Sequence, residues 1–140
     1  MRVVFDTNIL VLNLIGEPAT TIIDAALTGF SGEQLSFYYS PAIRQEYRTV
    51  LTRLAEQHPD IFYLQDVIKL LFDVEQAGHL VHPTITLDVC SHEPDNRFLE
   101  GAVAAQANYL VTVNTDHFPT TYQSIKIVQP RQFYRFLFAD

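Results

Sequence analysis

The chain has 140 residues, of which 48% are hydrophobic and 18% are charged, so it can bury a core of its own and we expect a folded domain rather than a disordered segment. Nine Lys and Arg against sixteen Asp and Glu leave a formal net charge of −7, which argues against sequence-independent binding of nucleic acid on a broad basic face. A single cysteine and the lack of a long apolar run exclude a disulfide framework and a membrane span, and we expect a soluble, cytoplasmic protein.

The hydrophobic pattern of the first part of the chain predicts strands separated by helices. Short β-branched and aromatic runs are typical of strands buried on both faces, and Gly, Pro and capping residues mark helix ends. Ser40 followed by Pro41 indicates a helix start, because the serine hydroxyl caps the helix and proline suits its first position. We expect a strand at 2–5, helices at 8–15 and 19–27, a strand at 35–39 and a helix at 42–55.

The rest of the chain continues this alternation. Strands that alternate with helices predict an α/β fold, with a mainly parallel sheet and helices on its faces. In such sheets ligands bind beyond the carboxyl ends of the strands, so polar residues directly after strands are the first candidates for a site. We expect a helix at 61–76, an extended segment at 80–84, a helix at 95–107, strands at 109–113 and 125–128, and a helix at 130–138.

Asp6 is the first candidate, because it directly follows the hydrophobic strand at 2–5. A buried carboxylate is costly unless a cation or hydrogen bonds compensate its charge. The alternative is that Asp6 caps the following helix. A haloacid-dehalogenase-like phosphotransferase would also carry an aspartate here, but it needs a second one at position 8, which is Asn8.

Two further acids lie on or next to predicted helices. Glu46 lies at the edge of the apolar stripe of the helix at 42–55, where it is either a site acid or an ordinary solvated residue. Asp95 precedes an amphipathic run and is typical of a helix N-cap. The two interpretations of Asp95 are compatible, since a helix start can present the same carboxylate to a metal.

The segment around the end of the strand at 109–113 carries Thr112, Asn114 and Asp116. These side chains either line the crevice at the strand end or satisfy the backbone of their own loop. Taken with the other acids, they form a set of oxygen ligands without cysteine and without an obvious histidine pair, which favours Mg²⁺ or Mn²⁺. Two such ions can hold the attacking and leaving oxygens of a phosphodiester, as in many nucleases.

Several motifs, in matching order and spacing, resemble those of the PIN-domain family and cover nearly the whole chain. They are 4–10 with its Asp-Thr-Asn sequence, 40–51 around Glu46, 93–100 around Asp95, the strand at 109–112, and 127–133. The last of these resembles the subgroup described as toxin components of toxin–antitoxin systems. The resemblance implies a single PIN-like domain over residues 1–140, folded as a three-layer α/β/α sandwich with a central, mainly parallel sheet and frequently dimeric.

The resemblance also implies an activity and its partners. It points to a metal-dependent ribonuclease, often a VapC-like toxin that cuts RNA and is silenced by a small antitoxin. The metal ligands and catalytic acids that it implies are Asp6, Glu46, Asp95 and Asp116, with Mg²⁺ or Mn²⁺ as the cofactor. Without the ion, carboxylates this close repel one another, so at least one is expected to have a raised pKa.

Asn8, Ser40 and Thr112 match polar positions around these acids, and we expect them to orient the acids. Asn114 stands where the family often carries an aspartate. Either Asp116, two residues further on, supplies the charge, or Asn114 is a neutral ligand and the site is one charge short. The second case gives the alternative function, in which the chain is a catalytically impaired PIN-like module that binds RNA or a protein partner.

The remaining candidates are surface residues. Arg44, Arg48 and Arg97 are the expected contacts to RNA phosphates. The apolar helix around 61–72 either packs inside the domain or faces a second copy or an antitoxin. A receiver-like phosphoacceptor is excluded, because the chain lacks an adjacent acidic pair after the first strand and a lysine after a late strand.

Overall fold

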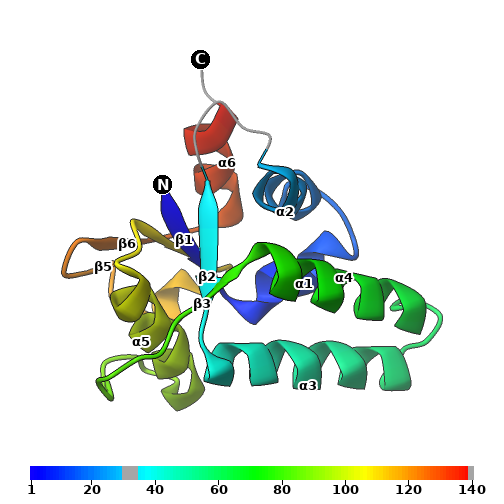
Figure 1. Cartoon of the computed structure of the whole chain (residues 1–140), viewed down its shortest axis with the longest axis horizontal. Coiled ribbons are helices and arrows are strands. Elements are labelled where there is room, and N and C mark those ends of the chain that lie inside the picture. Colours follow the sequence, from blue (N-terminus) through cyan, green and yellow to red (C-terminus); the bar gives the residue numbers. More distant parts are fainter. Residues whose placement is uncertain (30–34, 139–140) are drawn as a thin grey trace.

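The computed structural model describes residues 1–29 and 35–138, in which helices lie on both sides of a six-stranded sheet (Figure 1). The strand order is β3-β2-β1-β4-β6-β5, and every neighbouring pair is parallel except β5 with β6. This confirms the predicted three-layer α/β/α fold with a mainly parallel sheet. The strands are β1 (Arg2–Phe5), β2 (Ser36–Tyr39), β3 (His79–Leu80), β4 (Tyr109–Val111), β5 (Thr121–Tyr122) and β6 (Ile125–Val128).

The helices lie close to their predicted positions. They are α1 (Thr7–Asn13), α2 (Ala19–Thr28), α3 (Pro41–Gln57), α4 (Leu64–Ala77), α5 (Asn96–Ala105) and α6 (Pro130–Phe138), with the 3₁₀ turns η1 (Glu93–Asp95) and η2 (Thr115–His117). The predicted extended segment at 80–84 is shorter in the structure, where β3 ends at Leu80. The short strand β5 was not predicted. In the described part of the chain, none of the helices combines the length and the apolar character that crossing a membrane requires.

The central strands form the core of the protein. Val3, Val4 and Leu110 are completely buried, which explains why their strands are apolar on both faces. The ring of Phe5 is also buried, with its centroid 5.9 Å from that of Phe37 and 6.3 Å from that of Phe133. This packing fixes the carboxyl end of β1, the point from which Asp6 leaves the sheet.

Three local features hold α3 in place beside the sheet. Ser40 is the predicted N-cap of α3, and its hydroxyl oxygen accepts a hydrogen bond of 3.1 Å from the backbone N–H of Ile43. Gly101 in α5 lets the two helices approach closely, because a Cβ at this position would lie 2.6 Å from Cδ1 of Ile43. The buried hydroxyl of Tyr47 donates to the carbonyl of Phe5 and joins α3 to the end of β1. These contacts set the distance between the helix that carries Glu46 and the sheet.

Candidate active site

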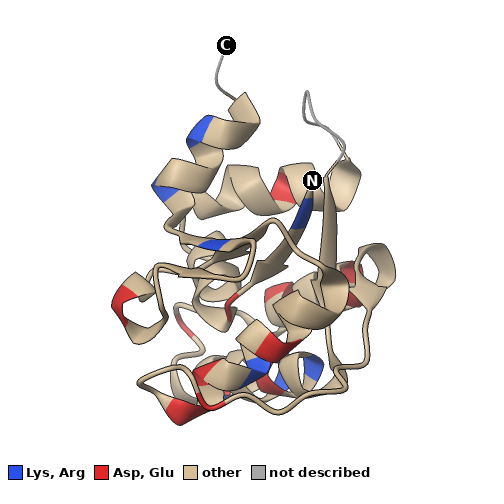
Figure 2. Ribbon diagram, turned by 90° about the vertical axis from the view of Figure 1, so that its left-hand side faces the viewer, with Lys and Arg blue, Asp and Glu red and all other residues tan. Residues whose placement is uncertain are grey.

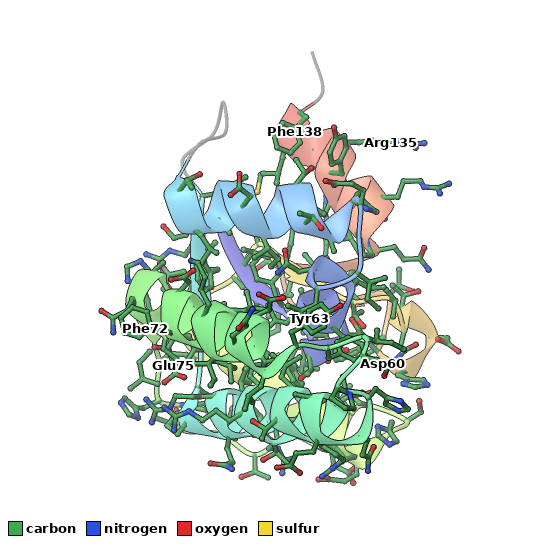
Figure 3. All side chains as sticks on the ribbon, turned by 90° about the vertical axis from the view of Figure 1, so that its right-hand side faces the viewer. Asp60, Tyr63, Phe72, Glu75, Arg135 and Phe138 are labelled. Carbon is green, nitrogen blue, oxygen red and sulfur yellow. The ribbon has the colours of Figure 1, made fainter. Side chains whose placement is uncertain are left out.

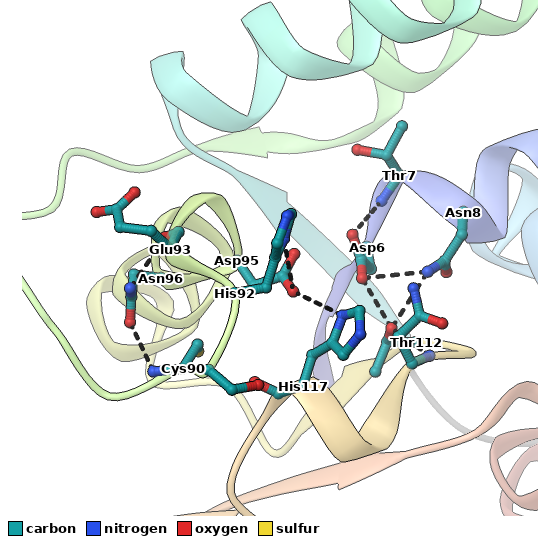
Figure 4. A network of polar contacts seen from close by, with 12 residues as sticks. Asp6, Thr7, Asn8, Cys90, His92, Glu93, Asp95, Asn96, Thr112 and His117 are labelled. Atoms are coloured by element: carbon teal, nitrogen blue, oxygen red, sulfur yellow. Dashed lines mark hydrogen bonds and ion pairs between the residues drawn. The ribbon is translucent and has the colours of Figure 1, made fainter.

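A pocket of about 260 Å³ lies beyond the carboxyl ends of β1 and β4. The chain leaves β1 toward β2, while β4 pairs with the other edge of β1, so this is a switch point of the sheet, where α/β proteins bind ligands. Figure 4 shows side chains from several segments converging here. The polar lining consists of Asp6, Thr7, Asn8, Glu46, His92, Asp95, Asn114 and His117.

Strand register places Asp6 beside Thr112. Phe5 pairs with Val111 across the parallel strands, so the next residue of each strand lies at the same edge of the sheet. Oδ2 of Asp6 accepts a hydrogen bond of 2.7 Å from the hydroxyl of Thr112 and one of 3.2 Å from Nδ2 of Asn8. Its Oδ1 accepts a bond of 2.8 Å from the backbone N–H of Thr7, so Asp6 is at once the N-cap of α1 and a wall of the pocket.

The environment of Asp6 favours its protonated form. Burial is the largest cause, and together with the nearby charges of Asp95 and Glu46 it raises the pKa of Asp6 to about 6. The hydrogen bonds from Thr112 and Thr7 act in the opposite direction, because they stabilise the carboxylate. The expectation that at least one clustered acid has a raised pKa is therefore confirmed.

Glu46 faces the pocket from α3, where it is half-buried. The hydroxyl of Thr7 donates a hydrogen bond to its Oε2. Burial raises the pKa of Glu46, and the charge of Asp95 adds to this, while the hydrogen bond from Thr7 and the charge of His92 oppose it. Thr7 thus contacts both acids, through its backbone N–H to Asp6 and through its hydroxyl to Glu46.

Asp95 enters the pocket at the junction of η1 and α5. It stands at the predicted N-cap position of α5, but its side chain makes no capping hydrogen bond. Instead, its Oδ2 lies 3.2 Å from Nδ1 of His117 and 3.5 Å from Nδ1 of His92. One ligand atom from each of these three residues lies within 4.8 Å of the others, which makes them a possible metal-binding group.

The sequence indicates no histidine pair, and the structure shows that His92 and His117 meet beside Asp95. They are far apart in the chain and converge because the loop before η1 meets η2, where the backbone N–H of Ser91 donates to the carbonyl of His117 over 3.1 Å. Asn96 was not among the predicted residues. Its Oδ1 accepts from the backbone N–H groups of Val89 and Cys90, each at 2.9 Å, and holds this loop against the start of α5.

Of the two residues offered for the fourth motif, only Asn114 lines the pocket. Its backbone N–H donates to the hydroxyl of Thr112 over 3.0 Å. Asp116 is exposed on η2 and lines a separate cavity, so the structure does not bring it to Asp6, Glu46 and Asp95. The arrangement favours the alternative in which Asn114 is a neutral group of the pocket.

The other expected residues lie outside the pocket lining. Ser40 is buried and caps α3, so its contact with the acids is indirect. Arg48 is engaged through two nitrogens with Glu75, and Arg97 pairs with Glu93 at 3.1 Å and with Glu100 at 3.0 Å. Arg44 has no ion-pair partner among the described residues. The structure gives these arginines no place beside the acids.

The donor set of the pocket fits a divalent cation. Three carboxylates from separate elements converge on it, and none of the described Lys or Arg side chains lines it. Carboxylate and amide oxygens are the ligands of hard cations, and two imidazoles add nitrogen donors that suit Mn²⁺ and other transition metals. The residues present therefore fit a divalent cation, and none of the described Lys or Arg side chains lines the pocket to balance their charge.

Comparison with known families assigns a family to this architecture. A family model described as a PIN domain matches residues 2–116. The matched range contains Asp6, Glu46, Asp95 and Asn114, all of which line the pocket, whereas the lining residue His117 lies just beyond it. A comparison with curated proteins finds no match.

Proposed function

Because the chain belongs to the PIN-domain family, we propose that it is a metal-dependent ribonuclease that hydrolyses RNA phosphodiester bonds at the pocket of Asp6, Glu46 and Asp95. PIN domains are typically metal-dependent nucleases, and RNA is the substrate that we assign to this one. We further propose that it is a VapC-like toxin component controlled by a small antitoxin. The observation that carries the proposal is the convergence of three carboxylates with no described Lys or Arg between them.

The roles of the residues follow from their contacts. Asp6, Glu46 and Asp95 would hold Mg²⁺ or Mn²⁺, with Asn114 as a neutral neighbour. A divalent cation in this place would neutralise phosphate charge and make a water molecule more acidic. The imidazoles of His92 and His117 beside Asp95 favour Mn²⁺ over Mg²⁺, since nitrogen donors suit Mn²⁺ better.

The remaining polar residues act by orientation. Thr112 and Asn8 both donate hydrogen bonds to Oδ2 of Asp6, and these two bonds fix the orientation of the carboxylate in the pocket. The hydroxyl of Thr7 does the same for Glu46. Occupation of the site requires that Asp6 lose its proton, so cation binding should release a proton near pH 6, the pKa of Asp6.

Cleavage of RNA by the purified protein tests this proposal. We expect cleavage with Mn²⁺ that EDTA abolishes, and we expect Asp6→Asn to lower the rate by more than about 100-fold, because removal even of a group that only supports a metal ligand costs 10–100-fold. Asp60→Asn, which changes an exposed carboxylate outside the pocket, is the matched control. Cleavage that survives EDTA, or full activity of Asp6→Asn, would overturn the proposal.

A second outcome of the same experiment concerns Asn114, which leaves the pocket one carboxylate short of the usual family pattern. If Mn²⁺ raises the melting temperature of the protein without any cleavage of RNA, the chain is a catalytically impaired module that binds metal and RNA or protein. In that case Asn114→Asp should increase the metal affinity. If neither melting temperature nor cleavage responds to Mn²⁺, the pocket does not hold the ion.

An exposed apolar surface supports a protein partner. Leu64, Ile68 and Phe72 form one face of α4, here called the α4 stripe, and these three side chains are 54%, 58% and 62% exposed (Figure 3). We assign this stripe to a homodimer, because a stripe on one helix can be covered by the same stripe of a second copy. Ile68→Glu should then convert a dimer to a monomer in solution, while Gln123→Glu, which adds the same charge to an exposed residue between β5 and β6, leaves it a dimer. If the wild type is a monomer, the homodimer is contradicted and the α4 stripe is assigned to an antitoxin instead.

A further inference from the structure

A second, larger cavity of about 670 Å³ lies between η2 and α6. We call it the α6 groove. Its polar lining comes from Thr115 and Asp116 of η2 and from Gln129, Arg131, Gln132 and Arg135 at and within α6. Most of these residues lie beyond residue 116, where the match to the family model ends, so the groove belongs to the part of the chain that the family comparison leaves undescribed.

The two arginines of the groove are held in a fixed arrangement. Arg131 and Arg135 are four residues apart on α6, so their side chains leave the same face of the helix about 6 Å apart along its axis. The opposite face of α6 is anchored by the buried residues Pro130, Phe133 and Leu137. Figure 3 shows Arg135 extending from the helix into solvent. The helix backbone therefore fixes the positions from which both arginine side chains extend.

These arginines are also free of acidic partners. Arg48, Lys69 and Arg97 form ion pairs with carboxylates, whereas Arg131 and Arg135 form none within residues 1–29 and 35–138. Figure 2 shows the two positive positions of α6 in the upper part of the molecule, while most of the acidic positions lie in its middle and lower parts. Among the described residues, Asp116 is the one acidic side chain that lines the groove, so two positive charges face one negative charge there, in a chain of net charge −7.

The groove adjoins the candidate active site through η2. His117 of this turn lines the pocket of Asp6 and Asp95, while Thr115 and Asp116 of the same turn line the groove. A strand of RNA that placed one phosphate at the three carboxylates would therefore have its neighbouring nucleotides next to the groove. Arginine binds phosphate through paired N–H groups, and glutamine and threonine donate to phosphate and sugar oxygens.

We propose that the α6 groove binds backbone phosphates of single-stranded RNA beside the bond that is cut, with Arg131 and Arg135 as the phosphate contacts. This inference rests on the proposed ribonuclease function and places its substrate on the structure. Arg131 and Arg135 then take the role that the sequence analysis gave to Arg48 and Arg97, whose guanidinium groups are paired with glutamates. Contacts to phosphate fix position and not sequence, so their loss should raise KM and leave kcat nearly unchanged.

The test is binding of a labelled single-stranded RNA to the full chain in EDTA, which prevents cleavage, at several salt concentrations. The double variant Arg131→Gln/Arg135→Gln should bind at least about tenfold more weakly and reduce the slope of log affinity against log salt by about 1.4, since each phosphate contact to single strands contributes ~0.7. The control Arg53→Gln/Lys126→Gln removes the same charge from exposed residues that do not line the groove and should bind like the wild type.

Equal weakening by the two double variants would show an effect of net charge alone and would overturn the inference, as would unchanged binding by the groove variant. Cleavage kinetics with Mn²⁺ separate this result from the fate of the proposed function. If RNA binding depends on the groove but no RNA is cleaved, the proposed ribonuclease function is contradicted and the proposed RNA binding by the α6 groove is supported. If cleavage depends on the metal but the groove variant has an unchanged KM, the ribonuclease function is supported and the proposed RNA binding by the α6 groove is contradicted.

Discussion

Asp6 and Asp95 are buried carboxylates of the same pocket, but the groups that hold them differ in kind. Asp6 accepts hydrogen bonds from the backbone of α1 and from the hydroxyl of Thr112, both fixed by the parallel strands β1 and β4. Asp95 is flanked by two histidines. His92, in the loop before η1, is largely exposed, and His117, on η2, is partly exposed. The sheet thus preorganises one acid, while irregular segments position the other.

This contrast has a chemical consequence. The rigid half of the pocket carries an acid whose charge is costly without a cation, because burial and neighbouring carboxylates raise its pKa. The other half offers imidazole nitrogens close to solvent, which can adjust to an ion. Changes on the Asp6 side should therefore alter the energetics of the whole fold, and changes on the histidine side should alter the choice of ion.

The largest expected effect is on stability against pH in EDTA. The folded-state pKa of Asp6, about 6, lies above the unfolded value of about 3.9, so its contribution to stability is fully present below pH 4 and is lost as the pH rises through 6. The loss is about 3 kcal/mol at pH 8, to which the raised pKa of Glu46 adds in the same direction.

Urea unfolding at pH 4 to 8 measures this loss, and Asp6→Asn should remove the part that belongs to Asp6. A wild-type stability that increases across this range in EDTA would contradict the assigned environment of Asp6. Added Mn²⁺ should reverse the trend, because the ion binds the charged carboxylates and competes with the proton.

Thr112→Val should lower the Mn²⁺ affinity and the cleavage rate 10–100-fold, because it removes a hydroxyl that orients Asp6 while keeping the shape of the side chain. Thr49→Val is the matched control, since Thr49 is exposed on α3 outside the pocket lining and its hydroxyl accepts a hydrogen bond from Gln45. Titration calorimetry and cleavage assays check both variants. Equal behaviour of the two would mean that the register of β1 and β4 does not preorganise the acid.

His117→Gln should lower the affinity for Mn²⁺ about tenfold and leave that for Mg²⁺ nearly unchanged, because it removes a nitrogen donor beside Asp95. His82→Gln, which changes an exposed histidine outside the pocket, is the control. The readout is the ratio of the two metal affinities. If the two affinities fall together, the imidazole only positions Asp95 and does not select the ion.

The smallest effect is expected at Ser40, which the sequence placed among the residues around the acids and which the structure shows as the cap of α3. Ser40→Ala should cost about 1 kcal/mol of unfolding free energy through the lost cap. The cleavage rate per folded molecule should not change. A large loss of activity in a protein that remains folded would give Ser40 a part in the site that its contacts do not show.

Strand-based parts of the site could be predicted from the sequence, because parallel strands end at a common edge. A carboxylate directly after β1 and a threonine directly after β4 had to meet there, and Asp6 and Thr112 do. The position of Glu46 followed from helical periodicity in the same way. Such periodic elements convert sequence spacing into direction, so their side chains can be placed without knowledge of the rest of the fold.

The irregular parts could not be predicted. The directions of Asn114, Asp116 and His117 depend on how η2 folds against the loop before η1, which hydrogen bonds between distant residues decide. Ion pairs between distant residues, such as that of Arg48 with Glu75, could not be predicted from the sequence either. For this reason the cations expected to meet RNA were placed on α3 and α5, whereas the free arginines next to the site are on α6.

Calorimetric titration of the protein with Mn²⁺ at pH 7.5 tests the central claim most directly, namely that Asp6, Glu46 and Asp95 together hold a divalent cation. At this pH Asp6 has already lost its proton, so we expect saturable binding to the wild type, unchanged binding to Asp60→Asn, and loss of binding in Asp6→Asn. Equal binding to the wild type and to Asp6→Asn would contradict it.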